Sequence, residues 1–186
     1  MHSIKSLLVS RALAYADTAH GNIDHVSKYT DEPYINHAIE VMEIVGGVPH
    51  TDEMLAAALL HDTIEDTSVT VEDIEREFGV TIAGLVRELT DQCHQGNRAA
   101  RKTAEAARLA TISRDAQTIK LADLISNTRS IVRYDPGFAR IYLREKAQVL
   151  AVMTSGDASL HALAVKLTEV ARTQIDARWP ATEGGD

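Results

Sequence analysis

The chain has 186 residues, of which 45% are hydrophobic but only 4% are aromatic. This length suits one domain with a substantial core, and an apolar content carried by Ala, Leu, Val and Ile favours helix–helix packing. The formal net charge of −8 excludes a broad basic surface for a nucleic-acid duplex or an anionic membrane. A small polyanionic substrate bound beside a metal ion is still compatible with this charge.

Cysteine usage and hydropathy indicate a cytoplasmic protein. Cys93 is the single cysteine, which rules out an internal disulfide and fits a reducing compartment. No apolar run approaches the roughly 20 residues that span a bilayer. The N-terminal segment is interrupted by Arg11 and Asp17, so it predicts an amphipathic helix and not a cleaved signal.

Apolar spacing predicts an all-α fold, a single compact multi-helix domain over residues 1–178 that is followed by a disordered tail at 179–186. A loop is expected at 21–33 and a turn at 135–137, where Asp-Pro-Gly interrupts the pattern. The helices are expected over about residues 3–20, 34–46, 52–66, 71–78, 81–92, 98–112, 116–132, 138–153 and 157–178.

Capping residues support several of these boundaries. Thr51 is positioned to cap the third helix, and Thr70 with Asp73 has the spacing of a capping box. Gly79 is expected to end the helix that this box begins, and Asp115 to cap the long helix after it. The third helix is almost wholly apolar up to His61, so we expect it to be central and buried.

The end of this third helix carries the first candidate site residues. His61 and Asp62 follow a buried apolar run, where an unpaired imidazole and carboxylate are costly to desolvate. Glu65 and Asp66 each lie four residues beyond one of them, so a continuous helix places all four groups toward one region. A bound cation relieves the repulsion between the carboxylates, whereas the alternative interpretation is a solvated acidic helix end.

Two further segments supply the remaining candidate ligands. His37 lies just inside the second helix among apolar residues, and Asp123 lies in the apolar helix segment IKLADLISN with Asn127 one turn later. Each residue alone is a weak signal, since a single His in such a segment is usually a satisfied core residue. Together with His61 and Asp62 they predict a site of two imidazoles and two carboxylates, a donor set suited to manganese, iron or zinc.

These motifs carry a family resemblance. The pattern H…HD…D resembles the HD superfamily of metal-dependent phosphohydrolases. The longer segments HDTIEDT, PYINH and KLADLISN resemble the hydrolase domain of RelA/SpoT-type alarmone enzymes, and most of all the small single-domain alarmone hydrolases. The resemblance covers roughly residues 5–155.

The resemblance implies hydrolysis of the 3′-pyrophosphate of guanosine tetra- or pentaphosphate to GDP or GTP and pyrophosphate, usually with Mn²⁺, although Fe, Zn or Co also fits. It implies metal ligation by the two-His, two-carboxylate set above and catalytic roles for Glu65 and Asp66, as general base or acid and as groups that orient the nucleophile. Asn127 and, on a weaker match, Tyr142 are implied to contact the nucleotide. A small-molecule nucleotide is therefore the expected partner.

One departure leaves the nucleotide open. Family members often carry an Arg-Lys pair in the loop before PYINH, where this chain offers Lys28 with His25. Arg98, Arg101 and Lys102 lie near the matching basic segment and either bind the diphosphate or are ordinary surface charges. Guanosine and adenosine alarmones both remain candidates.

Two other functions compete with alarmone hydrolysis. One is an HD phosphohydrolase acting on a different nucleotide, such as a deoxynucleotide or NADPH. The other is a non-catalytic nucleotide-binding module, against which the intact Glu65–Asp66 pair argues. No synthetase domain follows residue 186, so we expect the chain to degrade the alarmone and not to make it; the sequence specifies no oligomeric state.

Overall fold

The computed structural model describes residues 6–93 and 95–178, and the predicted tail at 179–186 lies outside them. Within the described residues the regular structure is helical, and one isolated antiparallel bridge joins Val26 to Pro33. None of these helices is both long and apolar enough to cross a membrane. The helices are α1 (Leu7–Gly21), α2 (Ile35–Val45), α3 (Asp52–Leu60), α4 (Thr63–Asp66), α5 (Val71–Phe78), α6 (Val80–Leu89), α7 (Arg98–Leu109), α8 (Arg114–Tyr134), α9 (Pro136–Val152) and α10 (Ala158–Arg178).

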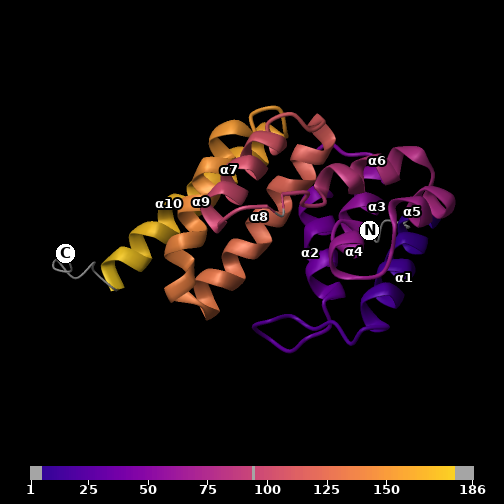
Figure 1. Cartoon of the computed structure of the whole chain (residues 1–186), viewed down its shortest axis with the longest axis horizontal. Helices are drawn as coiled ribbons and strands as arrows, with labels where there is room; N and C mark the ends of the chain where they lie inside the picture. The colour runs from indigo at the N-terminus through magenta and orange to yellow at the C-terminus, as the bar shows by residue number, and fades with distance from the viewer. Residues whose placement is uncertain (1–5, 94, 179–186) are drawn as a thin grey trace.

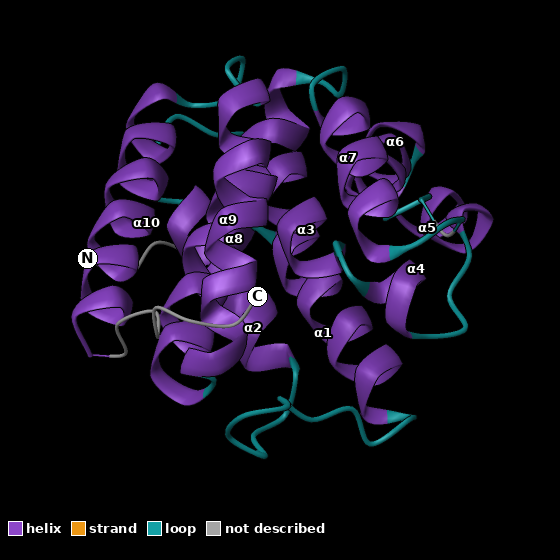
Figure 2. Cartoon of the chain, turned by 60° about the vertical axis from the view of Figure 1, so that its left-hand side comes forward, coloured by secondary structure: helices purple, strands orange, loops and turns teal. Residues whose placement is uncertain are grey.

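The helices form two groups joined by the long helix α8 (Figure 1). In the first group α3 packs against α1, α2, α6 and α8. In the second group α8, α9 and α10 pack on one another, and α7 packs on α9. The loop between α1 and α2 extends away from the helices in both views (Figure 1, Figure 2). Because α8 belongs to both groups, its side chains reach both the N-terminal core and the C-terminal helices.

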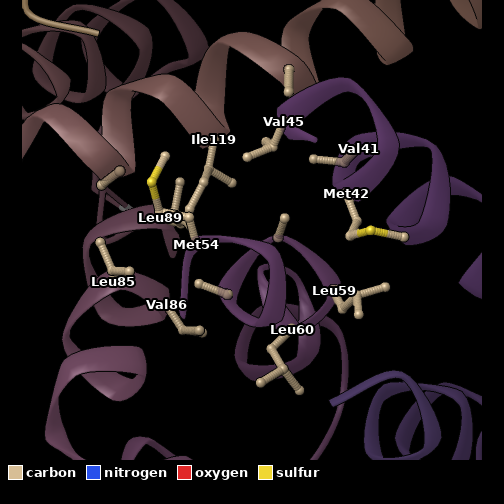
Figure 3. Packing of buried hydrophobic residues seen from close by; sticks show 14 of the residues in the cluster. Val41, Met42, Val45, Met54, Leu59, Leu60, Leu85, Val86, Leu89 and Ile119 are labelled. Carbon is tan, nitrogen blue, oxygen red and sulfur yellow. The ribbon is translucent and has the colours of Figure 1, made fainter. Parts of the chain in front are cut away.

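The main core surrounds α3, as its apolar sequence predicts. Every residue from Ala56 to Leu60 is buried, which is expected of a helix that is apolar on all sides. Figure 3 shows side chains of α2, α6 and α8 converging on this helix. The labelled members of this core are Val41, Met42, Val45, Met54, Leu59, Leu60, Leu85, Val86, Leu89 and Ile119.

A second, smaller apolar cluster fixes the C-terminal helices. Ile131 of α8 packs with Leu143 of α9 and Ile175 of α10, and Tyr29 of the α1–α2 loop packs against them. This cluster holds α9 alongside α8, and so it positions the α9 side chains that face the site described below.

Several predicted helix boundaries are confirmed. The Thr51 side chain accepts a hydrogen bond from the backbone N–H of Met54, and Thr70 and Asp73 form the full capping box. Gly79 ends α5 with a φ of 88°, a left-handed conformation that glycine adopts without the penalty other residues incur.

Two predicted boundaries are wrong. Ser113, and not Asp115, caps α8, because its side chain accepts from the backbone N–H of Ala116. The 135–137 segment is not a separate turn, since Asp135 ends α8 and its carboxylate at once caps α9. Pro136 is the first residue of α9, where its missing N–H costs nothing.

The third helix is not continuous through residue 66, and this correction matters for the site. Helix α3 ends at Leu60, the chain turns at His61–Asp62, and α4 begins at Thr63. Two side chains satisfy the final carbonyls of α3: His61 Nδ1 donates to Ala58 O at 2.8 Å and Thr63 Oγ1 donates to Leu60 O at 2.7 Å. These bonds offer the backbone an alternative to the helical ladder, which the apolar spacing alone does not reveal.

Candidate metal centre and adjoining cleft

Four polar side chains from three segments meet where α2, the α3–α4 turn and α8 come together. His37 Nε2 lies 3.2 Å from Asp123 Oδ1, and His61 Nε2 lies 2.9 Å from Asp62 Oδ2. Two longer distances link these pairs into one group. His37 Nε2 lies 3.9 Å from Asp62 Oδ2, and His61 Nε2 lies 3.8 Å from Asp123 Oδ1. The break after Leu60 makes this possible, because residues adjacent in a continuous helix point about 100° apart.

The hydrogen bonds of the two histidines fix which ring nitrogen faces the centre. The carbonyl of Ala58 only accepts, so His61 carries a proton on Nδ1, and in the neutral ring Nε2 is bare. Ser126 Oγ lies 3.0 Å from His37 Nδ1 and donates its own proton to Glu40 Oε2 at 2.7 Å. Ser126 therefore accepts from His37 Nδ1–H, and His37 Nε2 is bare as well. Such outer partners are what orient metal-binding histidines.

The geometry leaves two buried nitrogen lone pairs beside two carboxylates, and this is the test of whether a cation fits. Nε2 of both His37 and His61 is buried without a hydrogen-bond partner. One ligand atom from each of His37, His61 and Asp123 lies within 4.8 Å of the others. A cation placed among these atoms and beside Asp62 would accept the lone pairs of both histidines and offset the charges of both carboxylates. Mixed imidazole and carboxylate donors suit a divalent metal.

The electrostatics of the group favour positive charge at this point. Burial opposes ionisation of Asp123, but Lys120 and the two histidines hold the pKa of that carboxyl well below its usual range. Burial also opposes charge on His61, yet the Asp62 and Asp123 carboxylates raise its pKa to about 9. A proton is therefore attracted to this position when no metal is bound, so metal and proton compete for it.

Three further side chains hold the two carboxylates in place. Lys120 Nζ lies 2.8 Å from Asp123 Oδ2, and Asn127 Nδ2 donates to Asp123 Oδ1 at 2.5 Å. The hydroxyl of Tyr34 donates to Asp62 Oδ2. Each carboxylate thus enters the centre in a fixed orientation.

Glu65 and Asp66 lie on the short helix α4 at the edge of this centre. Glu65 Oε2 accepts a hydrogen bond from the backbone N–H of Asp91 at 3.2 Å. Desolvation raises the pKa of Glu65, while desolvation and the charge of Asp62 raise the pKa of Asp66 to about 6. Both carboxyl groups are therefore poised to exchange protons closer to neutrality than an ordinary carboxyl.

A cleft of about 350 Å³ opens beside the centre, and Asp62, Glu65 and Asp123 form part of its wall. The rest of the wall comes largely from α7, α8 and α9 and combines cations and apolar surface with three further carboxylates, those of Asp91, Glu105 and Glu145. Its cationic residues are Arg98, Lys102, Lys120 and Lys146, and its apolar residues include Leu109, Leu124, Ile131, Phe138 and Val149. Such a wall suits a ligand with both phosphates and a flat, largely apolar ring system.

Comparison with known proteins decides the family. The model of the HD domain family matches residues 12–155, which include every residue of the candidate centre. This chain belongs to the HD domain family.

Some relatives of this HD domain are named pyrophosphohydrolases, and others, such as rsh of Brucella ovis, are named GTP pyrophosphokinases. The guanosine-3′,5′-bis(diphosphate) 3′-pyrophosphohydrolase MESH1 of Drosophila melanogaster is 43% identical over 54% of this chain and 57% of its own length. MESH1 of Xenopus tropicalis is 37% identical over 67% of this chain and 70% of its own. A solved structure of a metazoan ortholog of SpoT that hydrolyses ppGpp superposes with a TM-score of 0.78, at 31% identity, over 91% of this chain and 96% of that one.

The HD domain brings only some of the predicted substrate residues to the cleft. Asn127, Tyr142, Arg98 and Lys102 line it. Lys28 and Arg101 are not among the lining residues. The Lys28 side chain is 72% exposed and pairs with Asp135 at 3.4 Å, and Arg101 Nη1 donates to the carbonyl of Gly96 at 2.8 Å.

Sequence reasoning missed several residues that shape the site. Lys120 lies three residues before Asp123, so its helical spacing offered a signal for the ion pair. Tyr34, Ser126 and Lys146 gave no such signal, because their roles depend on contacts across 28, 89 and 18 positions of the chain.

Proposed function

We propose that this HD domain hydrolyses the 3′-pyrophosphate of guanosine tetra- or pentaphosphate with Mn²⁺ as its metal. The observation that carries the proposal is the pair of bare imidazole nitrogens facing two carboxylates, beside a cleft lined by cations and apolar side chains. The activity for which the MESH1 relatives are named, and which the SpoT ortholog performs, supports this choice of substrate.

His37, His61, Asp62 and Asp123 are the residues that would hold the metal. Their imidazole and carboxylate donors suit Mn²⁺, and they also accept Fe, Zn or Co. A divalent cation bound there supplies charge for the phosphoryl oxygens and makes a water molecule more acidic. Ser126, Lys120 and Tyr34 keep the ligand atoms oriented toward the centre.

Glu65 and Asp66 perform the proton transfers in this proposal. Water adds to the phosphorus that carries the 3′-oxygen, the bond from that phosphorus to the 3′-oxygen breaks, and the products are pyrophosphate and the 5′-di- or triphosphate. The water must lose a proton and the 3′-oxygen must gain one. Glu65 lines the cleft and is placed to accept the first, and Asp66, which is not among the lining residues, is the neighbouring acid on α4.

The cleft accounts for nucleotide binding. Lys102 and Asn127 provide hydrogen-bond donors on the cleft wall, and Phe138 and Tyr142 of α9 provide aromatic surface on it. The cations of this wall lie among carboxylates, and a divalent cation bound at the centre would add positive charge for a phosphate-rich ligand. The acidic chain with its single cysteine also suits the cytoplasm, where we propose that it acts.

The test is a nucleotide panel with the purified chain and Mn²⁺. We expect pyrophosphate and GDP from guanosine tetraphosphate, and no release after chelation of the metal or in Asp123→Asn. The adenosine analogue, deoxynucleotides and NADPH belong in the same panel. Faster turnover of one of these three than of the guanosine alarmone rejects the proposed substrate, and binding of nucleotides without any turnover rejects the proposed catalysis.

A further inference from the structure

Lys146 of α9 is a buried cation on the wall of the cleft. Only 1% of the residue is exposed, although it belongs to the residues that line the cavity. Its Nζ donates to Thr128 Oγ1 of α8 at 2.6 Å. Thr128 in turn donates its own proton to the carbonyl of Leu124 at 2.6 Å. The threonine therefore holds one of the three ammonium donors with a neutral oxygen and contributes no charge.

No ion pair with a carboxylate is formed by Lys146 among residues 6–93 and 95–178, and Asp123 is the acidic residue whose charge it feels. Lys120 differs, because its Nζ lies directly on Asp123 at 2.8 Å. A buried ammonium without a counter-ion is costly, and burial lowers the pKa of Lys146 to about 8. A buried lysine facing a cavity with spare donors is a group to which an anionic ligand would supply the missing charge.

The position of Lys146 indicates which anion it meets. Its partner Thr128 lies on α8 five residues beyond Asp123, and Lys120, not Lys146, is the lysine whose Nζ contacts Asp123. The metal ligands and Lys120 are therefore the groups that meet the 3′-pyrophosphate. The base is uncharged, which leaves the 5′-diphosphate as the anion for Lys146.

On the basis of the function proposed above, we propose that Lys146 binds the 5′-diphosphate of the nucleotide while the 3′-pyrophosphate lies at the metal centre. Lys146 then selects nucleotides that carry 5′-phosphates, and Thr128 positions its ammonium. A charge-assisted hydrogen bond of this kind contributes roughly 10- to 100-fold in affinity.

The test compares two probes, GDP and guanosine, by calorimetry with the full chain loaded with Mn²⁺. We expect Lys146→Met to weaken GDP binding by about 10- to 100-fold and to leave guanosine binding unchanged. Thr128→Val keeps the charge but removes its anchor, so it should weaken GDP binding by a smaller factor. Lys166→Met removes an exposed lysine of α10 and serves as the matched control, with no change for either probe.

Three results overturn the proposal: equal GDP affinity in Lys146→Met and wild type, an equal loss for GDP and guanosine, or no GDP binding by the wild type. If circular dichroism shows that Lys146→Met does not fold, Thr128→Val is used in its place. It should weaken the binding of GDP and leave the binding of guanosine unchanged. Pyrophosphate release tests the proposed function separately. Turnover without a Lys146 effect rejects only the role of Lys146, and a Lys146 effect without turnover rejects only the hydrolysis.

Discussion

At the candidate metal centre each of the four side chains is fixed by a second partner, whereas the cations along the cleft differ in how they are held. His37 is held by Ser126, His61 by a backbone carbonyl and Asp123 by Lys120. Along the cleft, Arg98 is paired with Glu145 at 2.7 Å, whereas the hydrogen-bond partner of Lys146 within the described part of the chain is Thr128. The difference indicates that the side chains of the centre are held in one orientation for the chemical step. On the cleft wall, a cation without a carboxylate partner, such as Lys146, is available to bind a ligand.

The largest effect is expected at the centre itself. His61→Ala or Asp62→Ala should abolish metal binding and reduce activity by at least about 10³-fold, because each change leaves the remaining donors incomplete. Metal content after dialysis and pyrophosphate release measure the two effects. Full metal content in either variant would contradict the assignment, and His50→Ala, which changes an exposed histidine outside the candidate ligand set, is the control.

Next in size is the loss of a proton-transfer group without loss of the metal. Glu65→Gln should keep the metal and lower kcat by about 10²- to 10⁴-fold, because the amide keeps the acceptor for the Asp91 N–H but cannot take a proton. The same two assays apply. Turnover near the wild-type level in this variant removes Glu65 from the mechanism.

A smaller effect is expected when a candidate metal ligand loses the hydrogen-bond partner that orients it. Ser126→Ala removes the acceptor for His37 Nδ1–H and should weaken metal affinity by about 10- to 100-fold. Activity should return at high metal concentration, which a misfolded variant cannot achieve. Ser130→Ala, on the same helix, is the control, and equal metal affinity in both variants would show that the hydrogen bond to His37 is dispensable.

The smallest effects are expected from the two cations of α7 on the cleft wall, Arg98 and Lys102, and their sizes should differ. Lys102→Met should raise KM several-fold, and Arg98→Met should raise it less, because Glu145 already neutralises the Arg98 guanidinium. The Arg98 pair is partly exposed, so its removal should cost less than about 1 kcal/mol of folding free energy. A larger KM change for Arg98→Met would mean that the ligand displaces Glu145.

Local signals predicted most of the helices but not the break that builds the centre. Thr51, Thr70 and Gly79 act within their own turns, so their caps follow from neighbouring residues. The end of α3 depends on competition between the helical ladder and the side chains of His61 and Thr63. Apolar spacing carries no information about that competition, and the helix was therefore predicted six residues too long.

Residue types in the sequence predicted a single helical unit around an apolar third helix, with His37, His61, Asp62 and Asp123 as the candidate ligands. They could do so because burial of apolar helices and the high cost of unpaired buried charge act on any chain of this composition. Only the tertiary structure decided which nitrogen each histidine presents, that Lys28 and Arg101 lie off the cleft wall, and that Lys146 lies on it. Those features depend on pairs far apart in sequence, such as His37 with Ser126 and Lys146 with Thr128, whose approach is set by the packing of α8 against α2 and α9.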